Sequence, residues 1–304
     1  MTPDIEFFNF PHDFVENDNF FRQLAIDASA ESDNQRPIHF YGCYPDSNFL
    51  TKILMFIKSR MSNKGMTKWL DFQQGIVEPR DKHAFNVWCT FENRRPPVHG
   101  YDLSFSFDLD SYHDTNFYLP LILLYLRINT GASKHPITLA ETQMKRKLSE
   151  KEINAKIGFV SSFINNPHPM RLRAIKELNE LEPVAIFGRS VDHYVTDKLD
   201  EAKKYWFNLC FENDLYPGYV TEKVLEAWLS KSVPLYWGDD AAGILNKKAY
   251  INLRDFASLE DFSSYIAEII LDEKKLLEII EQPLFGKCPE YSDILKFFIK
   301  RLEA

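Results

Sequence analysis

The sequence is poor in cysteine, and its cysteines form no pattern of a disulfide framework or a zinc site. No Cys-x-x-Cys pair is present, and the four cysteines lie far apart, at Cys43, Cys89, Cys210 and Cys288. Their neighbourhoods are apolar or mixed, which is typical of small buried residues in a reducing compartment. Histidine pairs with metal-ligand spacing are also missing, and no Ser/His/Asp or Cys/His order indicates a catalytic nucleophile.

Long hydrophobic runs are missing as well. The longest apolar stretch, residues 117–126, contains Pro120 and is too short to span a bilayer. The first residues are acidic and lack the apolar run of a signal peptide. We therefore expect a cytoplasmic protein with at most peripheral contact at the inner membrane face. The basic amphipathic segment 294–302 could make that contact, but it fits a helix packed on the core better.

An excess of positive charge is the third absence. Lysines and arginines number 36 against 44 aspartates and glutamates, for a net charge of −8. The sequence therefore lacks the overall basic footprint of a nucleic-acid-binding protein, and an anionic ligand would need a local basic pocket. Hydrophobic residues make up 45% of the chain and aromatic residues 14%. That content suffices for two core-bearing domains or a single large one, and some of the rings can stack on bases and sugars.

The pattern of the chain changes near its middle. The first part contains short apolar runs that predict buried strands, at 37–42, 84–91 and 103–107, and a helical pattern at 49–61. A polar, basic stretch follows and predicts a domain linker, at 128–153. From residue 156, strands and helices alternate, ending in a long helix at 259–281 with an internal break. This alternation predicts a parallel sheet with helices on both faces, and a ligand site beyond the carboxyl ends of its strands.

The segment 207–238 carries the clearest chemical pattern. An apolar strand ends at Glu212, Pro217-Gly218 turns the chain, and a helix starts near Thr221, whose hydroxyl is the predicted N-cap. The free N–H groups and the dipole of a helix start attract an anion such as a phosphate. Lys223 in the first turn adds a cation to the same site.

The polar residues around that helix start suggest different roles. A carboxylate repels a phosphate but accepts hydrogen bonds from paired hydroxyls, so Glu222 is expected to bind a ribose or sugar diol. Asn213 offers neutral hydrogen-bonding groups and Tyr219 a ring face at the same rim. Taken alone, the segment also fits a capped surface helix that begins with Glu-Lys.

The order of the motifs within this segment is more specific. Phe211-Glu212-Asn213, then Tyr219 to Lys223, then Val233 to Gly238 resembles the signature of the family-10 α-1,3/4-fucosyltransferases. The spacing is similar to that of the bacterial Lewis-antigen enzymes of this family. The resemblance implies an α/β fold of the GT-B type, with two Rossmann-like domains facing a central cleft. Residues 1–150 would bind the acceptor and carry the general base, and residues 151–304 would bind GDP-fucose and end in terminal helices.

The resemblance also implies a reaction. It is an inverting α-1,3 transfer of L-fucose from GDP-β-L-fucose to a GlcNAc-type hydroxyl, in Lewis-type antigen or surface polysaccharide synthesis. The acceptor would be an oligosaccharide or glycolipid such as N-acetyllactosamine, and the preference for 3- over 4-linkage stays open. No cofactor beyond the donor is implied, and stimulation by a divalent cation is left open.

Two arginines enter through the same resemblance. Phe159-Val160-Ser161 followed by Arg171 is similar to the family's Val-x-Ser…Arg stretch, which contributes an arginine to the GDP phosphates. Gly188-Arg189-Ser190 is similar to a Tyr-Gly-Arg turn in several relatives, which makes Arg189 a second candidate for donor binding. Other members carry this arginine a few residues later.

In the first half, Glu92 is the candidate general base. Thr90-Phe91-Glu92-Asn93 ending in Pro96-Pro97 resembles the family's Glu-Asn-x-x-Pro element. A carboxylate at the end of the strand 84–91 could take the proton from the attacking acceptor hydroxyl. Arg94-Arg95 departs from the family pattern, and these arginines could lower the pKa of Glu92 or pair with it in a salt bridge.

Alternative functions remain at this level. Asp108-Leu109-Asp110 follows a predicted strand and could hold a divalent ion on a pyrophosphate, although such triplets are common by chance. A second alternative is a non-catalytic sugar-nucleotide or glycan-binding protein, against which the intact Glu92 argues. A third is a glycosyltransferase that uses another donor.

Overall fold

The computed structural model describes the chain in ranges, namely 3–10, 19–44, 78–97, 99–129, 131, 133–165, 167–188 and 191–304. The helix predicted at 49–61 lies outside these residues. Contacts divide the chain into two compact units: Met1–Pro136 together with Pro289–Ala304, and Ile137–Cys288. Each unit contains one five-stranded parallel sheet, which confirms the predicted α/β fold class. None of the helices in the described ranges is long and apolar enough to cross a membrane.

The first unit is built on a sheet with strands in sequence order, β1 to β5. The strands are Ile5–Phe8, Ile38–Gly42, Phe85–Cys89, Leu103–Ser106 and Asn116–Tyr118. A 3₁₀ helix, η1, follows at Leu121–Tyr125. The predicted strands at 37–42, 84–91 and 103–107 are present as β2, β3 and β4. All their residues are buried, as expected for a parallel sheet that is covered on both faces.

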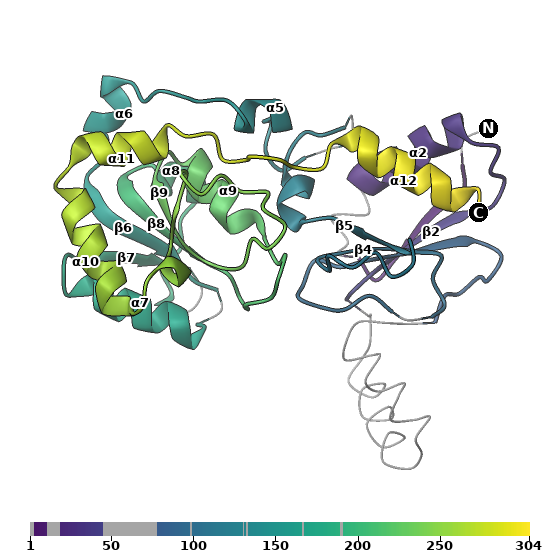
Figure 1. The fold of residues 1–304 in the computed structure, drawn as a ribbon, viewed down its shortest axis with the longest axis horizontal. Helices are drawn as coiled ribbons and strands as arrows, with labels where there is room; N and C mark the ends of the chain where they lie inside the picture. Colours follow the sequence, from purple (N-terminus) through teal and green to yellow (C-terminus); the bar gives the residue numbers. More distant parts are fainter. Residues whose placement is uncertain are drawn as a thin grey trace, which may run out of the picture. The chain divides into compact units, whose positions relative to one another are not determined.

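Two helices from opposite ends of the chain cover this sheet. Helix α2 spans Phe20–Glu31 and α12 spans Tyr291–Leu302, and the two lie side by side (Figure 1). Phe298 of α12 contacts the rings of three strands, with centroid separations of 6.1 Å to Phe40, 5.5 Å to Phe85 and 6.2 Å to Phe105. Burial of these apolar rings ties the last helix to the first sheet.

The division of the chain therefore differs from the predicted one at residue 150. Residues 137–150 belong to the second unit, and the last helix belongs to the first unit instead of ending the second. The physical reason is the apolar stripe of Ile294, Phe298 and Leu302 on α12, which is buried in the first unit's core. Contacts between residues this far apart in the sequence leave no local signal in its pattern.

The second unit has the strand order β10-β9-β8-β6-β7. Its strands are β6 Gly158–Phe163, β7 Val184–Phe187, β8 Tyr205–Phe211, β9 Val233–Trp237 and β10 Ile251–Asn252. Its helices are α5 Leu139–Thr142, α6 Glu150–Asn154, α7 Pro169–Asn179, α8 Lys198–Ala202, α9 Glu222–Leu229, η3 Leu253–Asp255, α10 Leu259–Ile270 and α11 Glu273–Ile280. The predicted alternation is confirmed, and the long helix is broken between α10 and α11.

The order of these strands reverses at β6. The chain passes from β6 to β7 on one side, then crosses back to place β8 on the other side of β6. Parallel crossovers are right-handed, so α7 and α8 cover opposite faces of the sheet. Contacts agree with this, since α10 contacts α7 whereas α9 contacts α8. The loops after β6 and β8 therefore lead to opposite faces of the sheet. In such sheets, loops that diverge in this way leave a crevice that binds ligands.

Lys156 is half-buried at the opposite, amino-terminal edge of this sheet. Its Nζ donates to the backbone oxygens of Tyr205 at 2.9 Å and Lys231 at 2.7 Å, and to Ser232 Oγ at 3.4 Å. Burial and the positive charge of Arg146 together lower the pKa of Lys156 to about 7, against the opposing effect of Glu152. The folded chain therefore releases a proton that the unfolded chain keeps.

This burial predicts a pH-dependent stability. Between pH 7 and the ordinary lysine pKa of 10.5, the unfolded chain binds more protons at Lys156, so the free energy of unfolding rises with pH. Relative to Lys156→Met, we expect it to rise by about 1 kcal/mol per pH unit from pH 7.5 to 9.5. Urea denaturation of both proteins across this range measures the difference. Parallel pH profiles for the two proteins would contradict the prediction.

Candidate active site

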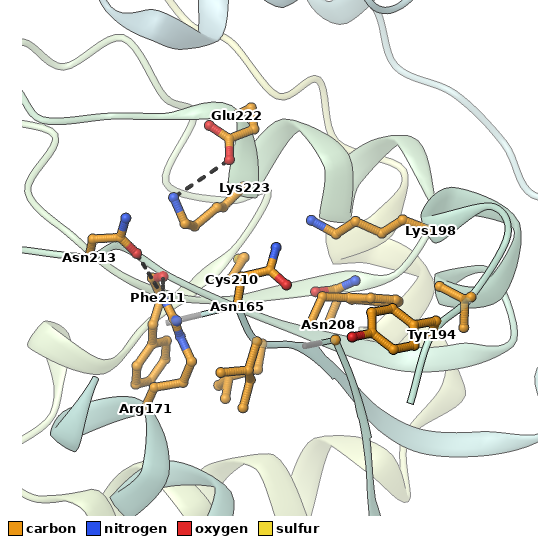
Figure 2. Close-up of a pocket in the computed structure, with 15 residues that line it drawn as sticks. Asn165, Arg171, Tyr194, Lys198, Asn208, Cys210, Phe211, Asn213, Glu222 and Lys223 are labelled. Carbon is orange, nitrogen blue, oxygen red and sulfur yellow. Dashed lines mark hydrogen bonds and ion pairs between the residues drawn. The ribbon is translucent and has the colours of Figure 1, made fainter. Parts of the chain in front are cut away.

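A cavity of about 370 Å³ lies at the carboxyl edge of the second unit's sheet. It is lined by the ends of β6 and β8, by residues after β7 and by the first turn of α9 (Figure 2). This is the crevice where the strand order reverses, and its size falls within the range of small-molecule sites. The topology of the sheet thus explains why the cavity forms at this edge.

Arg171 enters the cavity from the first turn of α7. The helix starts at Pro169, a residue suited to this position because its missing N–H needs no partner there. Arg171 is only 4% exposed, and its Nη2 donates to the backbone oxygen of Phe211 at 2.6 Å and to Asn213 Oδ1 at 3.4 Å. Burial lowers the pKa of Arg171, and the charge of Glu212 opposes this. The guanidinium thus joins α7 to the end of β8 inside the wall of the cavity.

Lys223 faces the cavity from the first turn of α9. Its Nζ donates to Thr221 Oγ1 at 2.9 Å and to Glu212 Oε2 at 3.2 Å, and it lies 3.6 Å from Glu222 Oε1. Glu222 lines the same cavity beside it. A cation and a carboxylate therefore lie next to each other at one wall, as the segment 207–238 predicts.

Thr221 differs from its predicted role. It is the N-cap residue of α9 by backbone conformation, but its side chain makes no capping hydrogen bond. Its hydroxyl oxygen instead accepts from Lys223 Nζ at 2.9 Å, and the hydroxyl donates to Glu212 Oε2 at 2.6 Å. Thr221 and Tyr219 are both about 1% exposed and do not line the cavity. The structure places them behind the wall, with the Tyr219 ring in the core.

Of the predicted donor-binding residues, four line the cavity together. They are Arg171, Asn213, Glu222 and Lys223. Arg189 lies outside the residues that the structure describes. The four come from α7, from the loop after β8 and from α9, so the fold joins two stretches that are 42 residues or more apart in sequence.

Sequence reasoning missed the opposite end of the cavity. Lys198 at the start of α8 pairs with Glu226 of α9, and the Tyr194 ring is 64% exposed in the loop after β7 (Figure 2). Gly188 allows this loop to turn back, since its φ is +118° and an added Cβ would lie 2.4 Å from the Ile164 oxygen. The position of this loop, directly after a predicted strand of a parallel sheet, is the signal that could have found both residues.

In the first unit, Glu92 lies just beyond the carboxyl end of β3. The pairing of Gly42 with Cys89 places the residues after β2 beside it. Tyr44 donates its hydroxyl to Glu92 Oε1 at 3.2 Å, and Thr90 Oγ1 donates to the backbone oxygen of Glu92 at 2.7 Å. The carboxylate is thus oriented by a neighbouring aromatic residue.

The two arginines after Glu92 have partners of their own. Arg94 Nη1 donates to the backbone oxygen of Cys43 at 2.7 Å, and Arg95 forms an ion pair with Asp108. Both side chains therefore help to hold the loop after β3 against its neighbours.

The Asp108/Asp110 triplet has a structural role in this unit. Asp108 is 3% exposed, and its Oδ2 accepts from the Tyr112 hydroxyl at 2.5 Å, while Asp110 accepts from the Tyr112 N–H at 2.8 Å. The two carboxylates thus organise a loop. Within the described ranges, no group of three histidine, cysteine, aspartate or glutamate side chains is arranged to hold a metal ion.

Among the comparisons with known proteins, the match to a family model falls entirely within the second unit. The model of glycosyltransferase family 10 (fucosyltransferase), C-terminal part, matches residues 149–281. The α-(1,3)-fucosyltransferase FucT of Helicobacter pylori is 30% identical over 258 residues, which cover 73% of this chain and 54% of the relative. The human 3-galactosyl-N-acetylglucosaminide 4-α-L-fucosyltransferase FUT3 is 27% identical over 217 residues, which cover 66% of this chain and 55% of the relative. The chain spans about half the length of these two curated relatives.

Solved structures agree with this assignment. A crystal structure of an α1,3-fucosyltransferase with GDP-fucose matches with a TM-score of 0.59 and 27% identity, over 75% of this chain and 77% of that one. A crystal structure of an α1,3-fucosyltransferase matches with a TM-score of 0.66 and 22% identity, over 100% and 91%. The two parallel five-stranded sheets match this GT-B-like fold. The chain therefore belongs to glycosyltransferase family 10, the fucosyltransferase family.

Proposed function

We propose that the chain is an inverting α-1,3-fucosyltransferase that moves L-fucose from GDP-β-L-fucose to a GlcNAc-type hydroxyl of a glycan such as N-acetyllactosamine. The observation that supports this most is the juxtaposition of Arg171, Lys223 and Glu222 in one cavity at the switch point of the sheet. Two cations with a neighbouring carboxylate suit a ligand that carries a diphosphate next to a diol. A sugar nucleotide is such a ligand.

Arg171 and Lys223 are the two cations that we assign to the diphosphate. The bond between fucose and phosphate breaks as the acceptor attacks, so negative charge grows on the departing GDP. Arg171 and Lys223 are held in place by buried partners, and fixed charges of this kind stabilise a growing anion without having to reorganise. These cations supply the charge that a divalent metal supplies in other transferases, so the reaction needs none.

The remaining cavity residues suit the sugars and the guanine of the donor. Glu222 and Asn213 can bind hydroxyls of the ribose or the fucose. At the other end, the exposed ring of Tyr194 offers a face for the guanine to stack on, and Lys198 offers a donor for its acceptor atoms.

Glu92 of the first unit is the proposed general base. A lone pair of its carboxylate takes the proton of the acceptor hydroxyl as the hydroxyl oxygen attacks the anomeric carbon. Attack from the face opposite GDP inverts the configuration at that carbon. The Tyr44 hydroxyl donates a hydrogen bond to Oε1 of Glu92, so we assign Oε2 to the acceptor hydroxyl.

The whole proposal is tested by a GDP-release assay with GDP-fucose and a panel of disaccharide acceptors, run with a metal chelator, followed by linkage analysis of the product. We expect turnover on an N-acetyllactosamine-type acceptor, with a 3-linked fucose in the product. Binding of GDP-fucose without turnover on any acceptor would favour a non-catalytic binding protein. Turnover only with another sugar nucleotide would favour a different donor.

Removal of the Lys223 charge is expected to weaken GDP binding. A hydrogen bond between charged groups contributes about 1.5–3 kcal/mol, so Lys223→Gln should raise the Kd for GDP by about tenfold to a hundredfold. Titration calorimetry measures this, with Lys274→Gln as the control because that side chain is 87% exposed on α11. Equal GDP affinity in wild type and Lys223→Gln would remove Lys223 from the phosphate site.

Replacement of the proposed base is expected to affect turnover and leave donor binding unchanged. General base catalysis contributes about 10²–10⁴-fold, so Glu92→Gln should lower kcat by about this factor. The Kd for GDP-fucose, measured in parallel, should stay near the wild-type value. If Glu92→Gln turns over at a rate near that of the wild type, another group acts as the base.

A further inference from the structure

The carboxylate of Glu212 joins three elements at the back of the cavity. Glu212 follows the last residue of β8 and is 0% exposed. Its Oε1 accepts from the Thr221 N–H at 2.8 Å and lies 3.5 Å from the Tyr236 hydroxyl of β9. Its Oε2 accepts from the Thr221 hydroxyl at 2.6 Å and from Lys223 Nζ at 3.2 Å. One side chain therefore connects the end of β8, the start of α9 and β9.

Burying the Glu212 carboxylate costs free energy, so its charge calls for an explanation. Removing a carboxylate and an ammonium from water costs several kcal/mol for each ion, and a buried pair is often no more stabilising than apolar side chains of the same size. If Glu212 only held the start of α9, a neutral amide could accept the same hydrogen bond from the Thr221 N–H. The charge of Glu212 is matched instead by that of Lys223, whose ammonium also faces the cavity.

Against the effect of burial, the charged groups around Lys223 together raise the pKa of its ammonium, and Glu212 is the largest contributor among them. Burial lowers the pKa of Lys223, but Glu212 from the end of β8 and Glu222 from its own helix more than reverse this, and Arg171 of α7 opposes them. The net effect is a raised pKa. Tyr236, the group of β9 that contacts the carboxylate, stays protonated because burial and Glu212 both raise its pKa.

We propose that Glu212 is the positioning residue of the donor phosphate site, which holds the Lys223 ammonium at the cavity wall and keeps it charged there. The Thr221 hydroxyl completes the arrangement, since it donates to Glu212 and accepts from Lys223. Two anchors thus fix the lysine before the ligand arrives. The inference rests on the proposed function only in naming the diphosphate of GDP as the ligand of Lys223.

The charge of Glu212 is tested by Glu212→Gln in the full chain. The amide keeps the length of the side chain and an acceptor for Thr221, but it leaves Lys223 in a half-buried site beside a neutral partner. A lysine with a lowered pKa loses its charge as the pH rises, so GDP affinity should fall more steeply with pH in the variant than in the wild type. At pH 9.5 we expect a Kd for GDP about tenfold above the wild-type value.

Titration calorimetry with GDP from pH 7.5 to 9.5 measures this effect. The window lies above the second ionisation of a phosphate, near pH 6, so the diphosphate keeps its charge throughout, and the ionisation of the guanine ring near the upper end of the window is the same for both proteins. Glu281→Gln is the matched control, because it makes the same chemical change at a carboxylate that accepts from the Leu148 N–H and does not line the cavity. Identical pH profiles of GDP affinity for wild type and Glu212→Gln would overturn the proposal.

A ligand-free measurement separates this inference from the proposed function. The Lys223 ammonium is titrated by NMR of the lysine side chains, with its signal assigned by comparison with Lys223→Arg. We expect its pKa to be lower in Glu212→Gln than in the wild type, and an unchanged pKa overturns the role of Glu212. If neither protein binds GDP, the proposed function fails and this titration still decides the role of Glu212.

If Glu212→Gln fails to fold, Glu212→Asp serves as a second test. The shorter side chain keeps the charge but moves it away from Lys223 by the length of one methylene. We expect a Lys223 pKa and a GDP affinity between those of the wild type and a protein without the carboxylate. A wild-type pKa and a wild-type GDP affinity in Glu212→Asp would contradict the role of the Glu212 carboxylate in positioning Lys223.

Discussion

Strand β6 has β7 on one side and β8 on the other, and the placement of the cavity follows from that arrangement. Because the crossovers on the two sides are right-handed, α7 and α9 lie on opposite faces of the sheet, yet both start at its carboxyl edge. Arg171 from one helix and Lys223 from the other therefore reach the same crevice. In the first unit, the described strands follow each other in sequence order, and no such reversal occurs among them.

The cations of the cavity are each anchored within the protein. Arg171 is bound to the end of β8, Lys198 to the buried Glu226, and Lys223 to the buried Glu212. An acidic chain can thus present an anion-binding site, because each positive group is fixed by a specific partner and no broad basic surface is needed. Glu226 and Lys223 lie one turn apart on α9, so this short helix supplies a cation to one end of the cavity and the ion-pair partner of Lys198 at the other.

The sequence predicts the end of the cavity that a linear motif encodes. Asn213, Glu222 and Lys223 lie within 11 residues of one another in a strand–loop–helix segment whose pattern is local. Tyr194 and Lys198 lie in a loop and a five-residue helix without periodicity, and only the folded sheet brings them to the same edge. Thr221 is the predicted N-cap residue, but its capping hydrogen bond is absent for a related reason. Its hydroxyl accepts from Lys223 and donates to Glu212, and Glu212 becomes its neighbour only when β8 and α9 meet.

The same reasoning about strand ends applies to Glu92, although the family match does not extend to it. Parallel pairing of β2 and β3 fixes which residues beyond their carboxyl ends are neighbours, and it brings Tyr44 to Glu92. Arg95 is held by Asp108 in the loop after β4, the next strand of the sheet. The residues on either side of Glu92 are therefore tied to two neighbouring strands, whereas its carboxylate stays partly exposed at the sheet edge. A general base needs this combination of a fixed position and an accessible oxygen, and here the order of the strands supplies it.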